Sequence, residues 1–331
     1  VAAGRPEGLT LAIVRSGRVV YERAYGLRNV QLGLPATEDT RYEIGSLTKE
    51  ITAAAVMQLV EKGAVSLDAP LSLYLPDAPH ASEITIRQLL SMTSGLPEYL
   101  AGPTLIEDVR SPATPDKLLS RIAGKPLNFR PGTQWQHSNT NYLLLGLVIQ
   151  AVSHEPYERY VFDHVLSQVG GATFSTVGDE SNVRMMAIGY AGGKVSPALN
   201  DSWIGPAGNL VGTIGDMVAW DMALSSGAVV TKTSYVAMTP RQTPATSMVG
   251  YGFAFFVDRC LAQPRIWQDG STLGFNGSDQ YFPVQDTRII VLTNTNDGDS
   301  LADVLAQRVF EDLYPSIRRV SARGRYRAPA A

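Results

Sequence analysis

Cysteine is nearly absent from this sequence of 331 residues. The single residue of this type, Cys260, excludes an internal disulfide bond, and so low a count is compatible with an oxidising or a reducing compartment. Cys260 ends the apolar stretch YGFAFFVDRC, where we expect a strand and a buried thiol.

Histidine and glycine-rich signature loops are also scarce. The four histidines are His80, His137, His154 and His164, and no pair has the spacing of metal ligands, so we expect no metal. Neither a P-loop nor a G-x-G-x-x-G loop between a strand and a helix is present, so we expect no nucleotide cofactor. A G-x-S-x-G elbow is missing too, which argues against the α/β-hydrolase fold.

Charge and long apolar runs are limited. Charged residues make up 18% of the chain and the net charge is -3, which gives no electrostatic reason to expect nucleic acid. The basic cluster RRVSARGRYRAPA is terminal, and we interpret it as a solvated end. The longest apolar run, YLLLGLVI, is far shorter than the roughly 20 residues that a membrane-spanning helix needs. The chain begins with Val1, which is compatible with removal of an N-terminal segment.

Strand patterns lie at both ends of the sequence and helical patterns in its middle. Strands are predicted for residues 9–16, 18–26, 251–258, 263–270, 278–283 and 287–296, and helices for 46–63 and 300–314 at the two ends. We therefore predict a mixed α/β (α+β) fold with an antiparallel sheet flanked by helices. Residues 1–67 and 247–331 form the α/β domain, and residues 68–246 form an inserted, mainly helical domain.

The segment GSLTK places Ser46 and Lys49 three residues apart at the start of a predicted helix, where they share one face. A serine here is often only a helix cap. A lysine in the first turn is unfavourable for the helix dipole, and partial burial would lower its pKa and make it a general base. Alone, this spacing also arises by chance.

Two further segments strengthen the interpretation. QWQHSNTNYLLLG contains His137 and Asn139 at the entry to an apolar helix. WQDGSTLGFNG contains Gly270, which allows close backbone approach at a strand edge, and then Ser271. The order of the three segments is typical of serine enzymes that form an acyl-enzyme intermediate.

With these motifs, the chain resembles the serine β-lactamase and penicillin-binding-protein superfamily, in its class C β-lactamase and esterase branch. RYEIGSLTKEITAAAVMQLVEKGAVSLDAPLSLYLP, ITIRQLLSMTSGLPEY and GFNGSDQYFPVQDTRIIVLTNTND are similar to that branch as well, in the same order. The resemblance extends to about residue 314 and implies an α/β domain from both termini with an inserted helical domain. It also slightly favours a periplasmic or secreted location.

The resemblance implies a role for each motif residue. Ser46 would be the nucleophile and Lys49 its proton partner. The backbone N–H groups of Ser46 and Ser271 would form the oxyanion hole. Asn139 would hydrogen-bond the lysine or the substrate amide.

The second motif departs from the family pattern, because His137 occupies the usual tyrosine position. Histidine has an ordinary pKa near 6.5 and can move a proton near neutrality, so His137 could relay the proton between Lys49 and the leaving group. Activity would then fall on an acid limb near pH 6–7. Alternatively, His137 caps the following helix or hydrogen-bonds the backbone, and catalysis is crippled.

The third motif departs as well, with Gln268 in place of Lys or His and with Asp269 in place of a small residue. Residues at these positions and Gly270 are implied to bind substrate. Loss of the cation and addition of an anion disfavour carboxylate-bearing β-lactams and D-Ala-D-Ala peptides. We expect a small-molecule ester or amide substrate that is neutral or carries an amine.

Three functions stay open from the sequence. The first is a serine hydrolase acting on esters or amides. The second is a β-lactamase or D,D-peptidase in which another cation, Arg130 or Arg265, replaces the missing one. The third is a catalytically silent member that binds a ligand in the same cleft. The sequence does not separate a hydrolase from an acyl transferase, and it does not give the oligomeric state.

Overall fold

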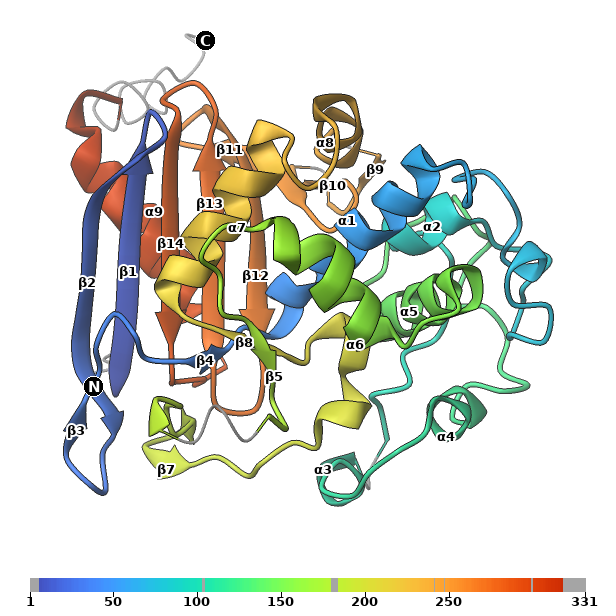
Figure 1. The fold of residues 1–331 in the computed structure, drawn as a ribbon, viewed down its shortest axis with the longest axis horizontal. Coiled ribbons are helices and arrows are strands. Elements are labelled where there is room, and N and C mark those ends of the chain that lie inside the picture. The colour runs from blue at the N-terminus through green and yellow to red at the C-terminus, as the bar shows by residue number, and fades with distance from the viewer. Residues whose placement is uncertain are drawn as a thin grey trace, which may run out of the picture.

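The computed structural model describes residues 6–102, 105–179, 184–240, 242–246, 248–298 and 300–317 (Figure 1), and the basic cluster RRVSARGRYRAPA lies outside these ranges. The strands are β1 (Gly8–Arg15), β2 (Arg18–Asn29), β3 (Leu34–Pro35), β4 (Tyr42–Glu43), β5 (Ser175–Thr176), β6 (Tyr190–Ala191), β7 (Lys194–Val195), β8 (Leu210–Gly212), β9 (Thr243–Pro244), β10 (Gly250–Tyr251), β11 (Phe256–Cys260), β12 (Gln263–Ser271), β13 (Asn276–Phe282) and β14 (Thr287–Thr293). The α-helices are α1 (Thr48–Glu61), α2 (Ile86–Leu90), α3 (Leu105–Asp108), α4 (Pro115–Ser120), α5 (Asn139–Ser153), α6 (Tyr157–Tyr160), α7 (Ile214–Ser226), α8 (Lys232–Met238) and α9 (Leu301–Leu313).

Both ends of the chain build one nine-stranded antiparallel sheet, in the order β3-β2-β1-β14-β13-β12-β11-β10-β9. The N-terminal and C-terminal parts join where β1 pairs with β14, with Leu9 opposite Thr293 and Arg15 opposite Thr287. Figure 1 shows the blue N-terminal strands beside the orange C-terminal strands. The predicted sheet and its origin from both termini are confirmed.

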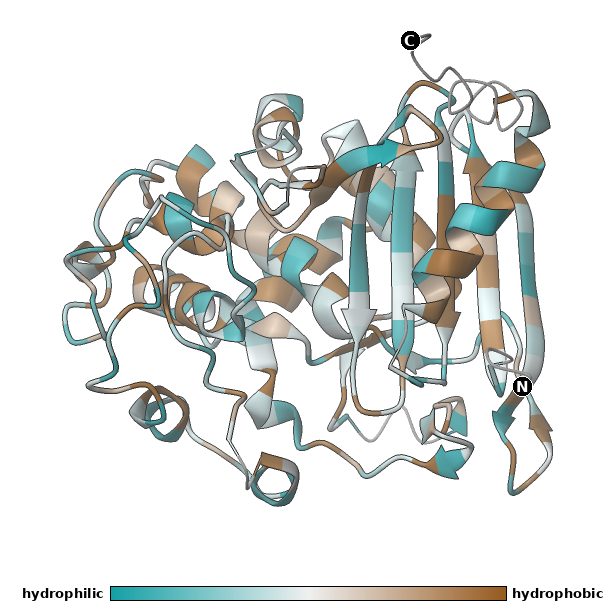
Figure 2. Cartoon of the chain, turned by 180° about the vertical axis from the view of Figure 1, so that it is seen from behind, coloured by the Kyte–Doolittle hydropathy of each residue, from teal (hydrophilic) through white to brown (hydrophobic). Residues whose placement is uncertain are grey.

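Helices cover both faces of this sheet. Ile289 and Val291 of β14 pack with Ala302, Ala306 and Phe310 of α9 in one apolar cluster. The alternate residues of β14 belong to the larger core, together with α1 and α7. Alternation along a strand sends successive side chains to opposite faces, so β14 is buried on both sides. Figure 2 shows α9 crossing the face that lies opposite α7.

The middle of the chain is mainly helical and packs beside the sheet. Its helix α5 contacts α1 and α2, while α7 contacts β1 and β14 and thus belongs to the layer that covers the sheet. The division at residues 68 and 246 stays a prediction. In the described part of the chain, no helix combines the length and apolarity needed to cross a bilayer.

One predicted strand is interrupted in the structure, and one helix of the middle region changes its hydrogen-bonding pattern. Residues 251–258 form two strands, β10 and β11, because the chain turns between them through Ala254 at φ +68°. After α6 the chain continues as a π-helical turn, Val161–Val165, and a 3-10 turn, Leu166–Gln168. Cys260 ends β11 and is buried, as expected.

Candidate active site

Ser46 and Lys49 meet at the start of α1. Ser46 lies in a 3-10 turn, Gly45–Leu47, that leads into the helix, and Leu47 occupies the N-cap position, so Ser46 does not act as the cap. Nζ of Lys49 donates a hydrogen bond to Oγ of Ser46 at 2.7 Å and another to the carbonyl of Ala207 at 2.8 Å. The predicted approach of hydroxyl and amine is present in the structure.

The ammonium group of Lys49 is fully buried. Burial disfavours the charged form and lowers the pKa of Lys49 to about 8, although the carboxylates of Glu98 and Asp269 oppose this shift. A substantial fraction of Lys49 is therefore neutral near pH 8. A neutral amine at 2.7 Å can accept the Ser46 proton.

Close packing of two glycines brings β12 against the nucleophile turn. A Cβ on Gly270 would lie 1.9 Å from the carbonyl oxygen of Ile44, and a Cβ on Gly45 would lie 2.7 Å from the backbone nitrogen of Ser271. Gly45 also has φ +53°, a conformation that favours glycine. The main chain before Ser271 thus lies against the turn that holds Ser46. The backbones of the two serines predicted to form the oxyanion hole therefore lie close together.

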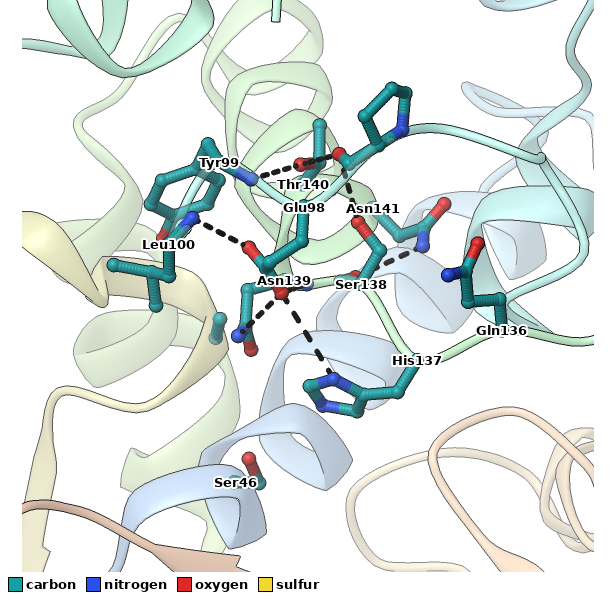
Figure 3. Close-up of polar contacts among 12 residues, drawn as sticks. Ser46, Glu98, Tyr99, Leu100, Gln136, His137, Ser138, Asn139, Thr140 and Asn141 are labelled. Carbon is teal, nitrogen blue, oxygen red and sulfur yellow. Dashed lines mark hydrogen bonds and ion pairs between the residues drawn. The ribbon is translucent and has the colours of Figure 1, made fainter. Parts of the chain in front are cut away.

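His137 lies at the entrance of α5 with its ring between Glu98 and Ser46 (Figure 3). Its Nδ1 is 4.0 Å from Oε2 of Glu98. Ser138 occupies the N-cap position of α5, and its hydroxyl donates to the carbonyl of Pro97. The alternative in which His137 caps this helix therefore does not hold.

The environment of His137 changes the expected pH dependence. Burial in the cleft and the charge of Lys49 lower the pKa of His137 to about 4. Water still reaches 48% of the side chain, which moderates the burial. A pKa this low keeps the ring neutral at pH 6–7, so we expect the acid limb to come from another group. Lys49, with a pKa of about 8, accounts for an acid limb instead.

Asn139 is held by Glu98 rather than by Lys49. Its backbone N–H and its Nδ2 donate to Oε2 of Glu98 at 2.8 and 3.0 Å. The other carboxylate oxygen accepts the backbone N–H of Leu100 (Figure 3). Glu98 thus connects the segment after α2 to His137 and Asn139 of the second motif. Sequence reasoning missed Glu98, since it precedes Asn139 by 41 residues and no local pattern pairs them.

The third motif presents two different environments along β12. Gln268 is 2% exposed, and its Oε1 accepts the backbone N–H of Asp269 at 3.3 Å. Asp269 is half-buried and lines the cleft together with Ser46 and Lys49. Burial raises the pKa of Asp269, while the charge of Lys49 opposes that rise.

Neither arginine considered as a replacement cation is found in the cleft. Arg265 is 6% exposed, and its guanidinium binds Asp258 at 2.7 and 2.9 Å and Asp303 at 3.2 Å. Arg130 is exposed and does not belong to the described cleft lining. The suggestion that one of them restores a carboxylate-binding cation is therefore wrong for this structure.

The cleft has a volume of about 350 Å³ and combines polar and aromatic walls. Its lining includes Gly45, Ser46, Lys49, Leu100, Trp135, His137, Asn139, Leu199, Ile204, Ala207, Gly208, Tyr251, Phe256, Gln268, Asp269, Ser271 and Thr272. Trp135 lies with its ring centroid 5.6 Å from Tyr251 and 5.9 Å from Phe256. Across the described ranges, no group of three or more His, Cys, Asp or Glu side chains is arranged to hold a metal ion.

Comparisons with known proteins agree with this geometry. Residues 1–314 match the protein family described as Beta-lactamase. The chain is 30% identical over 299 residues to PbpX of Bacillus subtilis (strain 168), a penicillin-binding protein by name, and the match covers 89% of this chain and 72% of PbpX. It is also 30% identical over 228 residues to Protein flp of Staphylococcus aureus (strain MW2), which covers 66% of this chain but only 45% of flp.

Solved structures with the same fold include an octameric penicillin-binding protein homologue from Pyrococcus abyssi, at 26% identity and a TM-score of 0.84, covering 94% of this chain and 74% of that chain. A D-stereospecific amidohydrolase from Streptomyces sp. has 26% identity and a TM-score of 0.75, covering 92% and 94%. D-amino acid amidase from Ochrobactrum anthropi SV3, at 21% identity and a TM-score of 0.82 over 94% of each chain, shares the fold.

Proposed function

Because this chain belongs to the Beta-lactamase family, we propose that it is a serine hydrolase that forms an acyl-enzyme on Ser46. The observation that carries the proposal is the 2.7 Å hydrogen bond between Ser46 and a fully buried lysine amine in a cleft. The family and its similar structures include serine hydrolases of the β-lactamase type, among them amidases by name.

Acylation begins when neutral Lys49 accepts the proton of the Ser46 hydroxyl. Oγ then attacks the substrate carbonyl carbon, and the resulting oxyanion lies between the backbone N–H groups of Ser46 and Ser271. Collapse of the tetrahedral intermediate breaks the bond to the alcohol or amine. The proton passes from Lys49 through neutral His137 to that leaving group, which departs as the free alcohol or amine.

Deacylation reverses these roles with water as the nucleophile. The water gives a proton to the Lys49–His137 pair as its oxygen attacks the acyl carbon. The carboxylic acid product leaves, and Ser46 regains its hydroxyl proton. Glu98 acts as a positioning residue here, because it holds Asn139 through two hydrogen bonds and lies 4.0 Å from His137.

Substrates without a carboxylate suit this cleft. Gln268 brings no charge to the third motif, and Asp269 would repel an anion. A hydrogen bond to a charged partner contributes about 1.5–3 kcal/mol against about 0.5–1.5 for a neutral one, so loss of the usual cation costs a carboxylate substrate about tenfold. We therefore assign esters and amides as the substrate class, ahead of β-lactams and D,D-peptides.

A fluorophosphonate probe tests the proposal directly. We expect the probe to label the wild-type chain on Ser46, as located by peptide mass spectrometry, because the activated hydroxyl attacks phosphorus as it attacks a carbonyl. Ser46→Ala should abolish labelling, whereas Ser120→Ala, at an exposed serine of α4, should leave it unchanged. A folded wild-type protein that stays unlabelled would instead favour the silent ligand-binding alternative.

The pH profile tests which group limits catalysis. Lys49 must be neutral to accept a proton, so kcat/KM should fall about tenfold per pH unit below about pH 8. The carboxylate of Asp269 raises the pKa of Lys49, so Asp269→Asn should move this limb to lower pH. Stopped-flow rates with a neutral ester, measured between pH 5 and pH 10, give both values. A limb at pH 6–7 that disappears in His137→Ala would assign it to the histidine instead.

A further inference from the structure

The cleft lining contains few charged side chains, and they are of both signs. Among the described lining residues, Lys49 is the only basic residue besides His137, and Asp269 is the only carboxylate. Two hydrogen bonds tie the Lys49 amine to Ser46 and to Ala207. Glu98 adds a second carboxylate next to His137. Lys49 therefore provides the main positive charge beside these carboxyl groups.

Loss of this positive charge is part of the reaction. Lys49 removes the Ser46 proton only in its neutral form, and the low pKa of about 8 makes this form accessible. In the form that reacts, the cleft lining holds no cation beside the half-buried carboxyl group of Asp269. A carboxylate in such a place is stabilised by any cation that enters the cleft, since water screens the pair only in part.

Aromatic side chains of the cleft provide a surface for the uncharged part of a ligand. Trp135, Tyr251 and Phe256 lie within 5.9 Å of one another between ring centroids and line the same cleft. Such rings pack against an apolar group, and their faces also attract a nearby ammonium. A ligand with one cationic and one apolar or aromatic part would use both walls.

We propose that Asp269 forms a binding site for a positively charged amine on the substrate, so that the preferred substrates are amides or esters bearing an ammonium group beside an apolar or aromatic group. This inference rests on the proposed serine hydrolase function and specifies its substrate class. It assigns Asp269 as the residue that determines specificity. Where other branches of the superfamily bind a carboxylate on the substrate, this cleft binds an ammonium group on the substrate.

Two matched substrate pairs test the inference, because the ammonium could lie on either side of the scissile bond. In the first pair, phenylalanine p-nitroanilide is compared with 3-phenylpropanoyl p-nitroanilide, which lacks the amine. In the second, butyrylthiocholine is compared with S-(3,3-dimethylbutyl) thiobutyrate, its uncharged isostere. At about pH 6.5 the α-amino group is protonated, and the protonation of Lys49 affects both members of a pair equally.

We expect the cationic member of at least one pair to have a kcat/KM higher by about tenfold or more. Asp269→Asn should reduce that ratio by about tenfold, and added salt should reduce it in the wild type. Asp77→Asn removes the same charge from an exposed position outside the cleft lining and should leave the ratio unchanged. Ratios near one in both wild-type pairs would overturn the inference, as would a preference that persists in Asp269→Asn.

The outcome is separable from that of the proposed function. Fluorophosphonate labelling of Ser46 reports whether the nucleophile is active, regardless of any amine. Labelled protein without a cation preference would refute the amine site alone. If Ser46 is not labelled, the hydrolase proposal itself fails. Fluorophosphonate labelling of Asp269→Asn would show that the active site of this variant is assembled. The kcat/KM ratios of the wild type and their dependence on salt test the amine site even without that variant.

Discussion

Replacing Lys49 by methionine should lower kcat/KM for an ester by about 10³-fold, because the variant keeps the fold but loses the base for Ser46. Methionine has a similar length and no polar atom, so it fills the buried position beside Tyr142. Hydrolysis of p-nitrophenyl butyrate and the rate of fluorophosphonate labelling measure the loss. Lys62→Met, at an exposed lysine that ends the same helix, should retain wild-type activity.

The same variant should be at least as stable as the wild type. The pKa of Lys49 is lowered from 10.5 to about 8, so the folded state disfavours the ammonium by about 3 kcal/mol. This penalty is complete below pH 8 and fades as pH rises from 8 to 10.5, because the unfolded chain binds the proton more tightly there. The two lost hydrogen bonds offset part of the gain. A folded variant with full activity would contradict the role assigned to Lys49, and a variant less stable than the wild type would contradict the expected loss of the burial penalty.

Gly270→Ala should lower activity by about 10²-fold or more and lower the melting temperature. The new Cβ would lie 1.9 Å from the carbonyl oxygen of Ile44, so β12 must move away from the turn that holds Ser46. A displacement of about 1 Å is sufficient for such a loss when it separates a nucleophile from its oxyanion donors. Both kcat and the thermal transition should be measured, since the movement affects catalysis and packing together.

Gly170→Ala is the matched control for this substitution. Its added Cβ has no neighbouring atom within 4 Å, and the residue is exposed. We expect unchanged activity and a neutral or slightly higher stability, since alanine restricts the unfolded chain. If Gly270→Ala behaves like Gly170→Ala, the close contact between β12 and the nucleophile turn is not needed for catalysis.

Local patterns were sufficient to predict the parts of the site that depend on local geometry. Ser46 and Lys49 lie one helical turn apart, so their contact follows from the helix itself. The close approach at Gly270 was also predictable, because a glycine within a strand often marks such a contact. The antiparallel sheet followed from alternating strand patterns at both ends of the chain.

Features that depend on tertiary packing were not predictable in this way. Glu98 reaches Asn139 only because α2 and α5 pack together, and neither segment alone indicates the contact. Arg265 was a plausible cleft cation by proximity in sequence, yet its guanidinium binds Asp258 and Asp303 outside the cleft lining. The low pKa of His137 likewise reflects its burial and the nearby Lys49. From the residue type alone, the expected pKa of His137 was the ordinary histidine value near 6.5.

The proposed mechanism requires that Ser46 becomes acylated during turnover. Rapid acid quenching during hydrolysis of p-nitrophenyl butyrate, followed by mass spectrometry of the intact chain and of its peptides, tests this most directly. We expect one added butyryl group on the peptide that contains Ser46, and no adduct or turnover in Ser46→Ala. Sustained hydrolysis by Ser46→Ala, or an acyl group carried on another residue during turnover, would contradict it.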